Sequence, residues 1–129
     1  MAKFLIDTNI FLEILLAQER KEKCKAILNK KIENICISDF SLHSIGVILF
    51  KLNQHEQFNN FLKDVLPNVT VIHLPVTEYG TVSTIALKYK LDFDDAYQTT
   101  VAKFFKLKVD TMDKDFKKVA TFIDVEILK

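Results

Sequence analysis

Short apolar runs alternate with longer amphipathic stretches along this chain, and the two patterns predict different elements. Five runs have the length and the residue types of β-strands, at residues 4–6, 34–38, 68–74, 107–111 and 125–128. Between these runs, apolar residues recur at helical spacing. The predicted helices cover residues 10–16, 19–29, 41–52, 55–65, 77–89 and 93–106, with a helical turn or two at 114–119.

The order of these elements predicts the class of fold. Helices or helix pairs alternate with the strands, which is the pattern of parallel strands joined by right-handed crossovers. We therefore expect an α/β fold, with helices on both faces of a mostly parallel sheet of four to five strands. No repeat, linker or low-complexity segment marks a boundary, so residues 1–129 are predicted to form a single domain.

Composition narrows the class of protein further. A chain of 129 residues that is 49% hydrophobic, with two glycines and two prolines, favours an ordered, helix-rich domain. The formal net charge of +1 means that any binding of nucleic acid must use a local patch. The spacing of Cys24 and Cys36 fits neither a zinc site nor a redox pair, so both are expected to be buried, reduced thiols.

No stretch of the sequence is typical of a membrane span or a secretion signal. No segment approaches the roughly 20 consecutive apolar residues that cross a bilayer, and no basic region precedes a long apolar run at the start. We therefore expect a cytoplasmic protein that has no membrane partner.

Acidic residues fall where the predicted strands end. Asp7 directly follows the first strand, and Asp113 lies two residues beyond Thr111, the last residue of the fourth strand. Three further acids open the helix that leads into the fourth strand: Asp92, Asp94 and Asp95. Because ligands of open parallel sheets bind outside the carboxyl ends of the strands, these acids are expected to converge at one edge.

Each acid also has a purely structural explanation. Asp92 fits the N-cap position of its helix, and Asp95 fits the first turn, where the helix dipole favours an ionised carboxylate. Asp113 and Asp115 fit a solvated turn at the start of a helix. The functional interpretation therefore depends on the convergence of the acids rather than on any single one.

Asp7 is harder to explain structurally, because it lies between two apolar segments. A charged side chain in that position is costly unless it is paired or bound to a metal. It could cap the following helix or pair with a lysine such as Lys114, and Asn9 is available as the N-cap of that helix.

The helix at 93–106 is expected to have a polar and an apolar face. At 100° per residue, the polar face contains Asp92, Asp95, Thr99 and Lys103. The apolar face contains Phe93, Tyr97, Val101, Phe104 and Phe105. Asp94 points toward the apolar side at the helix start, where it can reach solvent.

Clustered carboxylates predict a specific chemistry. They repel one another unless a cation neutralises them, and hard oxygen ligands select Mg²⁺ or Mn²⁺. Because Mg²⁺ shares its remaining coordination positions with substrate phosphates, metal-assisted hydrolysis of phosphodiester bonds is the expected reaction.

Three segments, in this order and at this spacing, resemble the PIN-domain family, and within it the VapC-like toxins of toxin–antitoxin pairs. They are FLIDTNIFLEILL, LDFDDAYQTTVAKFF and VDTMDKDF. The resemblance covers nearly the whole chain. It implies a three-layer α/β/α sandwich, Mg²⁺- or Mn²⁺-dependent cleavage of RNA, a cognate antitoxin and a homodimer.

The resemblance also implies roles for individual residues. The metal-binding and catalytic acids would be Asp7, Asp95 and Asp113. The supporting positions of the motifs would be Thr8, Asn9 and Thr111.

One position departs from the family pattern. The second acid of the family is usually a glutamate on the helix after the second strand, and Ser44 occupies that position here. A hydroxyl brings no charge, so Asp39 and Asp94 are the acids that could compensate. The alternative function is therefore a catalytically impaired PIN-like domain that binds RNA or a protein.

Basic residues form two groups that could contact an RNA backbone. One contains Arg20, Lys21, Lys23, Lys25, Lys30 and Lys31. The other is nearer in sequence to the acids and contains Lys103, Lys106, Lys108, Lys114, Lys117 and Lys118. Solvated helix faces produce the same pattern.

Overall fold

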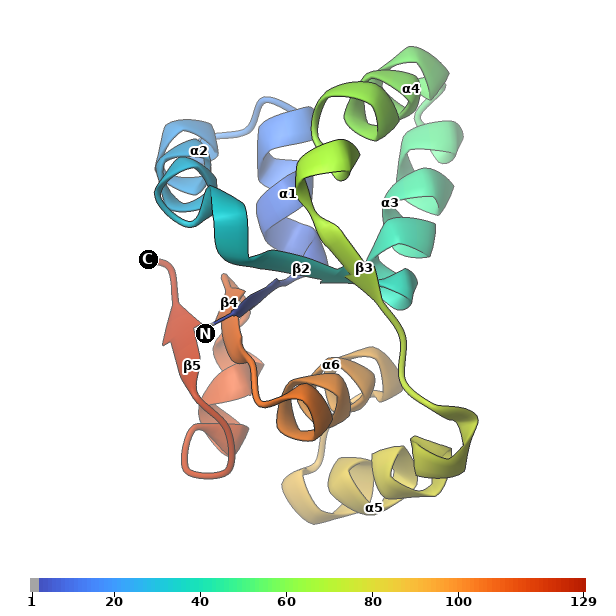
Figure 1. Cartoon of the computed structure of the whole chain (residues 1–129), viewed down its shortest axis with the longest axis vertical. Coiled ribbons are helices and arrows are strands. Elements are labelled where there is room, and N and C mark those ends of the chain that lie inside the picture. The colour runs from blue at the N-terminus through green and yellow to red at the C-terminus, as the bar shows by residue number, and fades with distance from the viewer. Residues whose placement is uncertain (1–2) are drawn as a thin grey trace.

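The computed structural model describes residues 3–129, which form a five-stranded sheet in the order β3-β2-β1-β4-β5 (Figure 1). All four neighbouring pairs of strands are parallel. The strands are β1 (Phe4–Ile6), β2 (Ile35–Ser38), β3 (Thr70–Ile72), β4 (Lys108–Thr111) and β5 (Val125–Ile127). The predicted α/β class and parallel sheet are confirmed.

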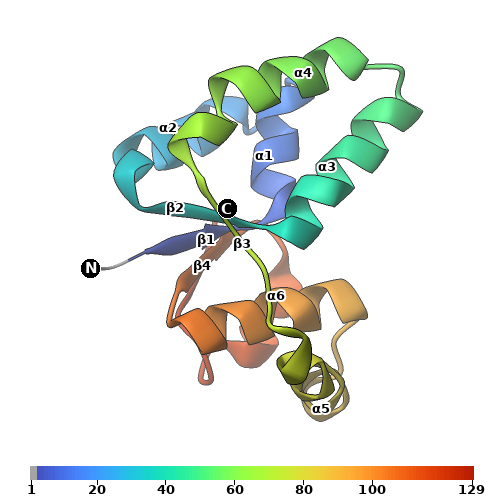
Figure 2. The same ribbon diagram turned by 45° about the vertical axis from the view of Figure 1, so that its right-hand side comes forward.

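Helices cover both faces of the sheet, as a three-layer α/β/α sandwich requires. The helices are α1 (Thr8–Leu15), α2 (Lys21–Lys30), α3 (Asp39–Lys51), α4 (His55–Asp64), α5 (Tyr79–Tyr89) and α6 (Phe93–Phe105). Short 3₁₀ turns are η1 (Ile32–Asn34), η2 (Leu66–Asn68), η3 (Val76–Glu78) and η4 (Lys114–Val119). Helices α1–α4 lie on one face, and α5 and α6 lie on the other (Figures 1 and 2).

The sheet separates two hydrophobic cores. Successive side chains of a strand point to opposite faces, and in β1 this sends Leu5 into the core beneath α5 and α6 and Ile6 into the core beneath α1–α4. Both residues are fully buried. A central strand that is apolar on both sides is the pattern of a parallel sheet covered by helices.

Side-chain caps shift two helix starts from their predicted positions. The prediction of Asn9 as N-cap of the first helix is wrong: α1 begins at Thr8, and Asp7 is its N-cap. Helix α3 begins two residues earlier than predicted, because the Ser38 hydroxyl at its N-cap accepts a hydrogen bond from the backbone N–H of Ser41.

The predicted two-faced character of α6 is wrong in part. Every residue in 96–102 is buried, because α6 packs between the sheet and α5. Thr99, expected on a polar face, is buried and donates its hydroxyl hydrogen to the Asp95 carbonyl at 2.8 Å. Three phenylalanines of the predicted apolar face are substantially exposed: Phe93, Phe104 and Phe105. Asp92 is the N-cap residue, although its side chain makes no capping hydrogen bond.

The helices of the described residues are short. Among residues 3–129, none is long and apolar enough to cross a membrane.

Candidate metal centre

The carboxylate of Asp7 lies at the carboxyl end of the central strand and is held there by the backbone. The N–H of Asp7 donates to the carbonyl of Asp110 in β4 at 2.9 Å, and Asp7 then begins α1. The residue is only 6% exposed. Asp7 therefore has a structural role between its two apolar neighbours: it caps α1 at the carboxyl end of β1.

Neutral donors surround the Asp7 carboxylate. Oδ1 accepts hydrogen bonds from Thr8 N at 2.9 Å and Gln98 Nε2 at 3.1 Å. Oδ2 accepts from Thr111 Oγ1 at 2.7 Å and from Asn9 Nδ2 at 3.4 Å. Of the two structural alternatives for Asp7, capping of the helix is the one observed: no lysine or arginine within residues 3–129, Lys114 included, forms an ion pair with Asp7. Burial raises the pKa of Asp7, and the hydrogen bonds from Thr111, Gln98 and Thr8 oppose that rise.

Gln98 was not predicted as a site residue, yet it links three elements. Its Nε2 also lies 2.8 Å from Ser41 Oγ, and its Oε1 accepts from Ser38 Oγ at 2.6 Å. Thr8 Oγ1 in turn donates to Ser41 Oγ at 2.8 Å. Gln98 follows Asp95 by three residues, so the same helix face carries both. This spacing from Asp95 is the feature of the sequence from which Gln98 could have been predicted as a site residue.

Three further acids gather beside Asp7. Each of Asp95, Asp113 and Asp115 offers a carboxylate oxygen, and these oxygens lie within 4.8 Å of one another. Asp113 is the N-cap of η4, where its Oδ1 accepts from Asp115 N at 2.8 Å, and its own N–H donates to Thr111 Oγ1 at 3.0 Å. Asp115 is exposed in the first turn of η4, as the sequence indicated, and the structure adds it to the expected acids by its proximity to Asp95 and Asp113.

Electrostatics indicates that this cluster fits a cation. Burial, followed by the negative charges of Asp113, Asp7 and Asp94, raises the pKa of Asp95 to about 8. Only carboxylate oxygens make up the cluster, and such hard donors suit Mg²⁺ or Mn²⁺ rather than softer metals. The residues present therefore fit a divalent metal ion.

A cleft of about 240 Å³ opens above these acids. Asp7, Asp95 and Asp113 line it, together with Asp94 and Ser44. The structure thus brings the three predicted acids to one cavity. Ser44 is half-buried and lies at the position predicted for the family's second acid. Asp94 is exposed at the rim, so it is placed to add negative charge near Ser44.

Asp39 does not compensate for Ser44. Its Oδ1 accepts hydrogen bonds from Tyr97 Oη at 2.7 Å and from Phe40 N at 2.9 Å, and it is not among the residues that line the cleft. Burial and the hydrogen bond to Asp39 raise the pKa of Tyr97 above its ordinary value. Asp39 therefore holds the side chain of Tyr97 in place and is not part of the metal centre.

Several lysines predicted to contact phosphate are engaged elsewhere. Lys108 lies at the opposite end of β4 from the acids and pairs with Glu126 at 3.1 Å. Lys103 Nζ donates to the Phe122 carbonyl at 3.3 Å. Lys118 Nζ also donates to a backbone carbonyl, that of Lys90 at 3.0 Å, but it lies 3.9 Å from Asp115 Oδ1, at the edge of the acidic cluster. Of these three lysines, Lys118 is thus the one that lies beside the acidic cluster.

Lys31 belongs to the first group of basic residues, but it forms a buried ion pair that the sequence did not predict. Lys31 Nζ lies 2.7 Å from Asp110 Oδ2, and the side chains are 13% and 2% exposed. The other oxygen of Asp110, Oδ1, has no hydrogen-bond partner within residues 3–129. Burial raises the pKa of Asp110, and the bond and charge of Lys31 oppose the rise. Lys31 therefore stabilises β4 rather than contacting an RNA backbone.

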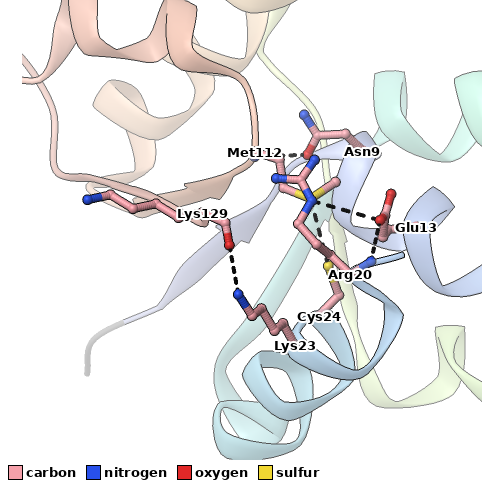
Figure 3. A network of polar contacts seen from close by, with 7 residues as sticks. All are labelled: Asn9, Glu13, Arg20, Lys23, Cys24, Met112 and Lys129. Carbon is pink, nitrogen blue, oxygen red and sulfur yellow. Dashed lines mark hydrogen bonds and ion pairs between the residues drawn. The ribbon is translucent and has the colours of Figure 1, made fainter. Parts of the chain in front are cut away.

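A second polar network connects the metal centre to α2 (Figure 3). Asn9, besides contacting Asp7, accepts a hydrogen bond on Oδ1 from Met112 N at 3.2 Å. Met112 Sδ lies 4.0 Å from Cys24 Sγ in α2, and the α1 residue Glu13 accepts from Arg20 N at 2.7 Å (Figure 3). Lys23 donates to the carbonyl of the final residue, Lys129, at 3.2 Å (Figure 3).

Comparison with known families agrees with this geometry. A family model described as PIN domain matches residues 4–121. This chain belongs to the PIN-domain family. The match spans both ends of the metal centre, from Asp7 to Asp115, and so includes every acid of the site. A search of curated proteins found no match.

Solved structures with the same fold include a toxin and proteins of toxin–antitoxin complexes. VapC20 of Mycobacterium tuberculosis, described as a sarcin-ricin loop cleaving toxin, has a TM-score of 0.80 at 18% identity, covering 96% of this chain and 99% of that chain. VapBC2 of Rickettsia felis, bound to a DNA fragment from its promoter, has a TM-score of 0.79 at 19% identity, covering 98% of both chains. A toxin–antitoxin complex from Klebsiella pneumoniae has a TM-score of 0.73 at 22% identity, covering 98% and 96%. At these identities the likeness confirms the PIN fold.

Proposed function

We propose that this PIN domain is a Mg²⁺- or Mn²⁺-dependent endoribonuclease and the toxin of a toxin–antitoxin pair. The observation that carries the proposal is the cluster of Asp95, Asp113 and Asp115, whose oxygens lie within 4.8 Å of one another beside the buried Asp7. Asp7, Asp95 and Asp113 form no ion pair with a lysine or arginine among residues 3–129. Three neighbouring carboxylates of this kind are costly unless a cation neutralises them. Membership of the PIN-domain family supports the same chemistry.

The acids and their neighbours have separate tasks in this proposal. Asp7, Asp95 and Asp113 hold the metal, and Asp115 is placed to join them. When bound, the metal acidifies a water molecule and offsets the negative charge that develops on the phosphate. Thr111, Asn9 and Gln98 fix the Asp7 carboxylate through hydrogen bonds, so its orientation is set before the metal arrives.

Ser44 is the reason to keep a second candidate function. It lines the cleft where the family usually has an acid, and it brings no charge to the metal. A PIN domain with a weakened metal site would act by binding RNA or a protein. We favour the enzyme because Asp94 lines the same cleft and Asp115 offers an oxygen within 4.8 Å of those of Asp95 and Asp113.

The partner proposal rests on the structural neighbours. Two of them are described as a toxin–antitoxin complex and as VapBC2 with promoter DNA. We infer that this chain likewise has a cognate antitoxin that covers the acidic cleft, and that it works as a cytoplasmic homodimer. A gene for a small antitoxin-like protein next to that of this chain, whose product forms a stable complex on co-expression, would support the inference.

The first experiment is a calorimetric titration of Mn²⁺ into the wild type, Asp95→Asn and Asp64→Asn. Asp64 is an exposed acid on α4 and serves as the matched control. We expect the wild type and Asp64→Asn to bind Mn²⁺, and Asp95→Asn to lose about 100-fold or more in affinity, because one carboxylate ligand becomes neutral.

An RNA cleavage assay then separates the enzyme from the binding module. Cleavage that requires Mn²⁺ or Mg²⁺ and is lost in Asp95→Asn supports the nuclease. A wild type that binds Mn²⁺ and RNA but cleaves no RNA would favour the binding module. A wild type with no Mn²⁺ binding, alone or with RNA present, would refute the metal centre.

A further inference from the structure

Four aromatic rings form a cluster beside the acidic cleft. Tyr97 of α6 is its centre, with ring centroids 6.1 Å from Phe40, 5.8 Å from Tyr79 and 6.2 Å from Phe93. The Phe93 ring is stacked on Tyr97 at an interplanar angle of 26°. The rings come from three helices, α3, α5 and α6, so the cluster exists only in the folded chain.

The centre of this cluster is rigid and its periphery is open. Tyr97 is only 2% exposed, and its hydroxyl donates to Asp39 Oδ1 and accepts from Leu74 N at 3.1 Å. Phe93, by contrast, is 58% exposed, and Tyr79 is 41% exposed. A buried, doubly hydrogen-bonded tyrosine therefore supports two rings that present much of their surface to solvent.

The cluster is continuous with the proposed active site. Phe40 lines the same cleft as Asp94 and Asp95. Phe93 directly precedes these two acids in the chain and occupies the first turn of α6. Nucleotides next to a phosphate that lies at the acids are therefore within reach of Phe40 and Phe93.

The charges around the rings select the part of a nucleotide that fits there. Asp94 is exposed and adjacent in sequence to Phe93, so a phosphate at the rings would meet a negative charge. A nucleobase is planar and uncharged, and stacking on an aromatic side chain contributes about 1–3 kcal/mol per base. Lys118, which lies 3.9 Å from Asp115, offers a positive charge to the backbone at the acidic cluster itself.

We propose that Phe93, with Phe40 and Tyr79, forms a stacking platform for an unpaired base next to the cleaved phosphodiester bond. The inference rests on the proposed nuclease function and names its substrate class. The platform selects single-stranded RNA, a loop or a bulge, because a base within a helix already has both faces stacked and is not available to a protein ring.

The test measures binding and cleavage of a short single-stranded oligoribonucleotide by the wild type, Phe93→Ala, Phe93→Tyr and Leu87→Ala. Leu87 is an exposed apolar residue of α5 and controls for loss of apolar surface alone. Binding is measured with Ca²⁺ in place of Mn²⁺, and cleavage with Mn²⁺. We expect Phe93→Ala to raise the Kd and the KM about tenfold. We expect Phe93→Tyr and Leu87→Ala to resemble the wild type.

Abasic substitution of the oligoribonucleotide, one position at a time, locates the stacked base. At that position the loss from Phe93→Ala should disappear, because the base that the ring holds is already missing. Two results would overturn the platform: a Kd of Phe93→Ala equal to that of the wild type, or equal losses at every abasic position. Conversion of a dimer to a monomer by Phe93→Ala would also overturn it, because the rings would then face a second copy.

The outcomes also separate the platform from the nuclease. A wild type that cleaves RNA with a KM insensitive to Phe93→Ala refutes the platform and leaves the nuclease intact. A wild type that binds RNA through Phe93 but never cleaves it refutes the nuclease and leaves the platform intact. A wild type that binds no RNA refutes the platform. The Mn²⁺ titration then tests the metal centre independently.

Discussion

The side-chain amide of Gln98 donates to Asp7 Oδ1 at 3.1 Å, although 91 residues separate the two in the chain. The same amide nitrogen lies 2.8 Å from Ser41 Oγ, and the amide oxygen accepts from Ser38. The first and second strands and α6 are thus joined at the metal centre by one buried side chain. A neutral donor in this position fixes the carboxylate while leaving its negative charge available to a metal.

Replacement of Gln98 by leucine is expected to weaken the metal site and the fold together. Asp7 Oδ1 would lose one of its two donors, and buried hydroxyls of Ser38 and Ser41 would lose a partner. We expect the free energy of unfolding to fall by about 1–3 kcal/mol and the Mn²⁺ affinity to fall about 10–100-fold. Urea unfolding and calorimetry measure the two effects.

The matched control is Gln57→Leu, which makes the same chemical change at an exposed position of α4. It should leave both quantities within error of the wild type. If Gln98→Leu lowers stability but binds Mn²⁺ as tightly as the wild type, Gln98 supports only the fold and does not position Asp7.

Introducing an acid at Ser44 is expected to strengthen the metal site. Ser44 lines the cleft with Asp7, Asp95 and Asp113, so a glutamate there adds a charged oxygen ligand to the cavity. We expect Ser44→Glu to raise Mn²⁺ affinity about tenfold, while Ser83→Glu, on the exposed side of α5, should have no effect.

The cleavage rate of Ser44→Glu then distinguishes the two candidate functions. A large gain in Mn²⁺-dependent RNA cleavage would mean that the wild type is an impaired enzyme. A wild type that already cleaves efficiently, with no gain from the added acid, would exclude the binding-only alternative. Weaker Mn²⁺ binding by Ser44→Glu would show instead that Ser44 is not beside the metal.

Metal binding is expected to release a proton from Asp95. In the metal-free fold the pKa of Asp95 is about 8, above its ordinary value of 3.8. The carboxylate must ionise to bind a cation, so at pH 7 the uptake of Mn²⁺ should release about one proton, and the release should fade above pH 8. Titrations in two buffers of different ionisation enthalpy measure this number, and no difference between buffers at pH 7 would contradict the raised pKa.

The same shift predicts how pH affects stability. Between the ordinary pKa of 3.8 and the folded value of about 8, the folded chain holds a proton that the unfolded chain does not. The free energy of unfolding of the metal-free protein should therefore fall as pH rises through this interval. Asp95→Asn should remove the contribution of Asp95 to that dependence and raise Tm at pH 7 by about 3–5 °C. A Tm of the wild type that rises from pH 5 to pH 8 would contradict the prediction.

The ion pair between Lys31 and Asp110 predicts a strong asymmetry among variants. Lys31→Met leaves a carboxylate that is 2% exposed without its cation, and we expect a loss of about 3 kcal/mol in the free energy of unfolding. The double variant Lys31→Met/Asp110→Leu should recover most of this loss, because the uncompensated charge is gone. Lys30→Met, at the exposed neighbouring position, is the control and should be near neutral. If Lys31→Met and the double variant were equally stable, the unpaired charge of Asp110 could not be the cause of the loss.

Local patterns were sufficient for much of the architecture and for part of the site. The apolar run at residues 4–6 and the acid after it correctly placed β1 and Asp7, because strand and cap signals depend on adjacent residues. The alternation of strands and helices likewise gave the parallel sheet. Asp115 lies in an exposed turn, as the sequence indicated, but its proximity to Asp95 was not predicted, because it depends on how η4 packs against α6.

The sequence by itself determined the class of fold, the position of the acids at strand ends and the resemblance to PIN domains, since these depend on periodicity and local spacing. Only the tertiary structure decided which side chains hold Asp7, why Lys31 is buried against Asp110, and why Phe93 is exposed on Tyr97. Those relationships join residues far apart in the chain. Their energies depend on burial and on distances of a few ångströms, which no local pattern specifies.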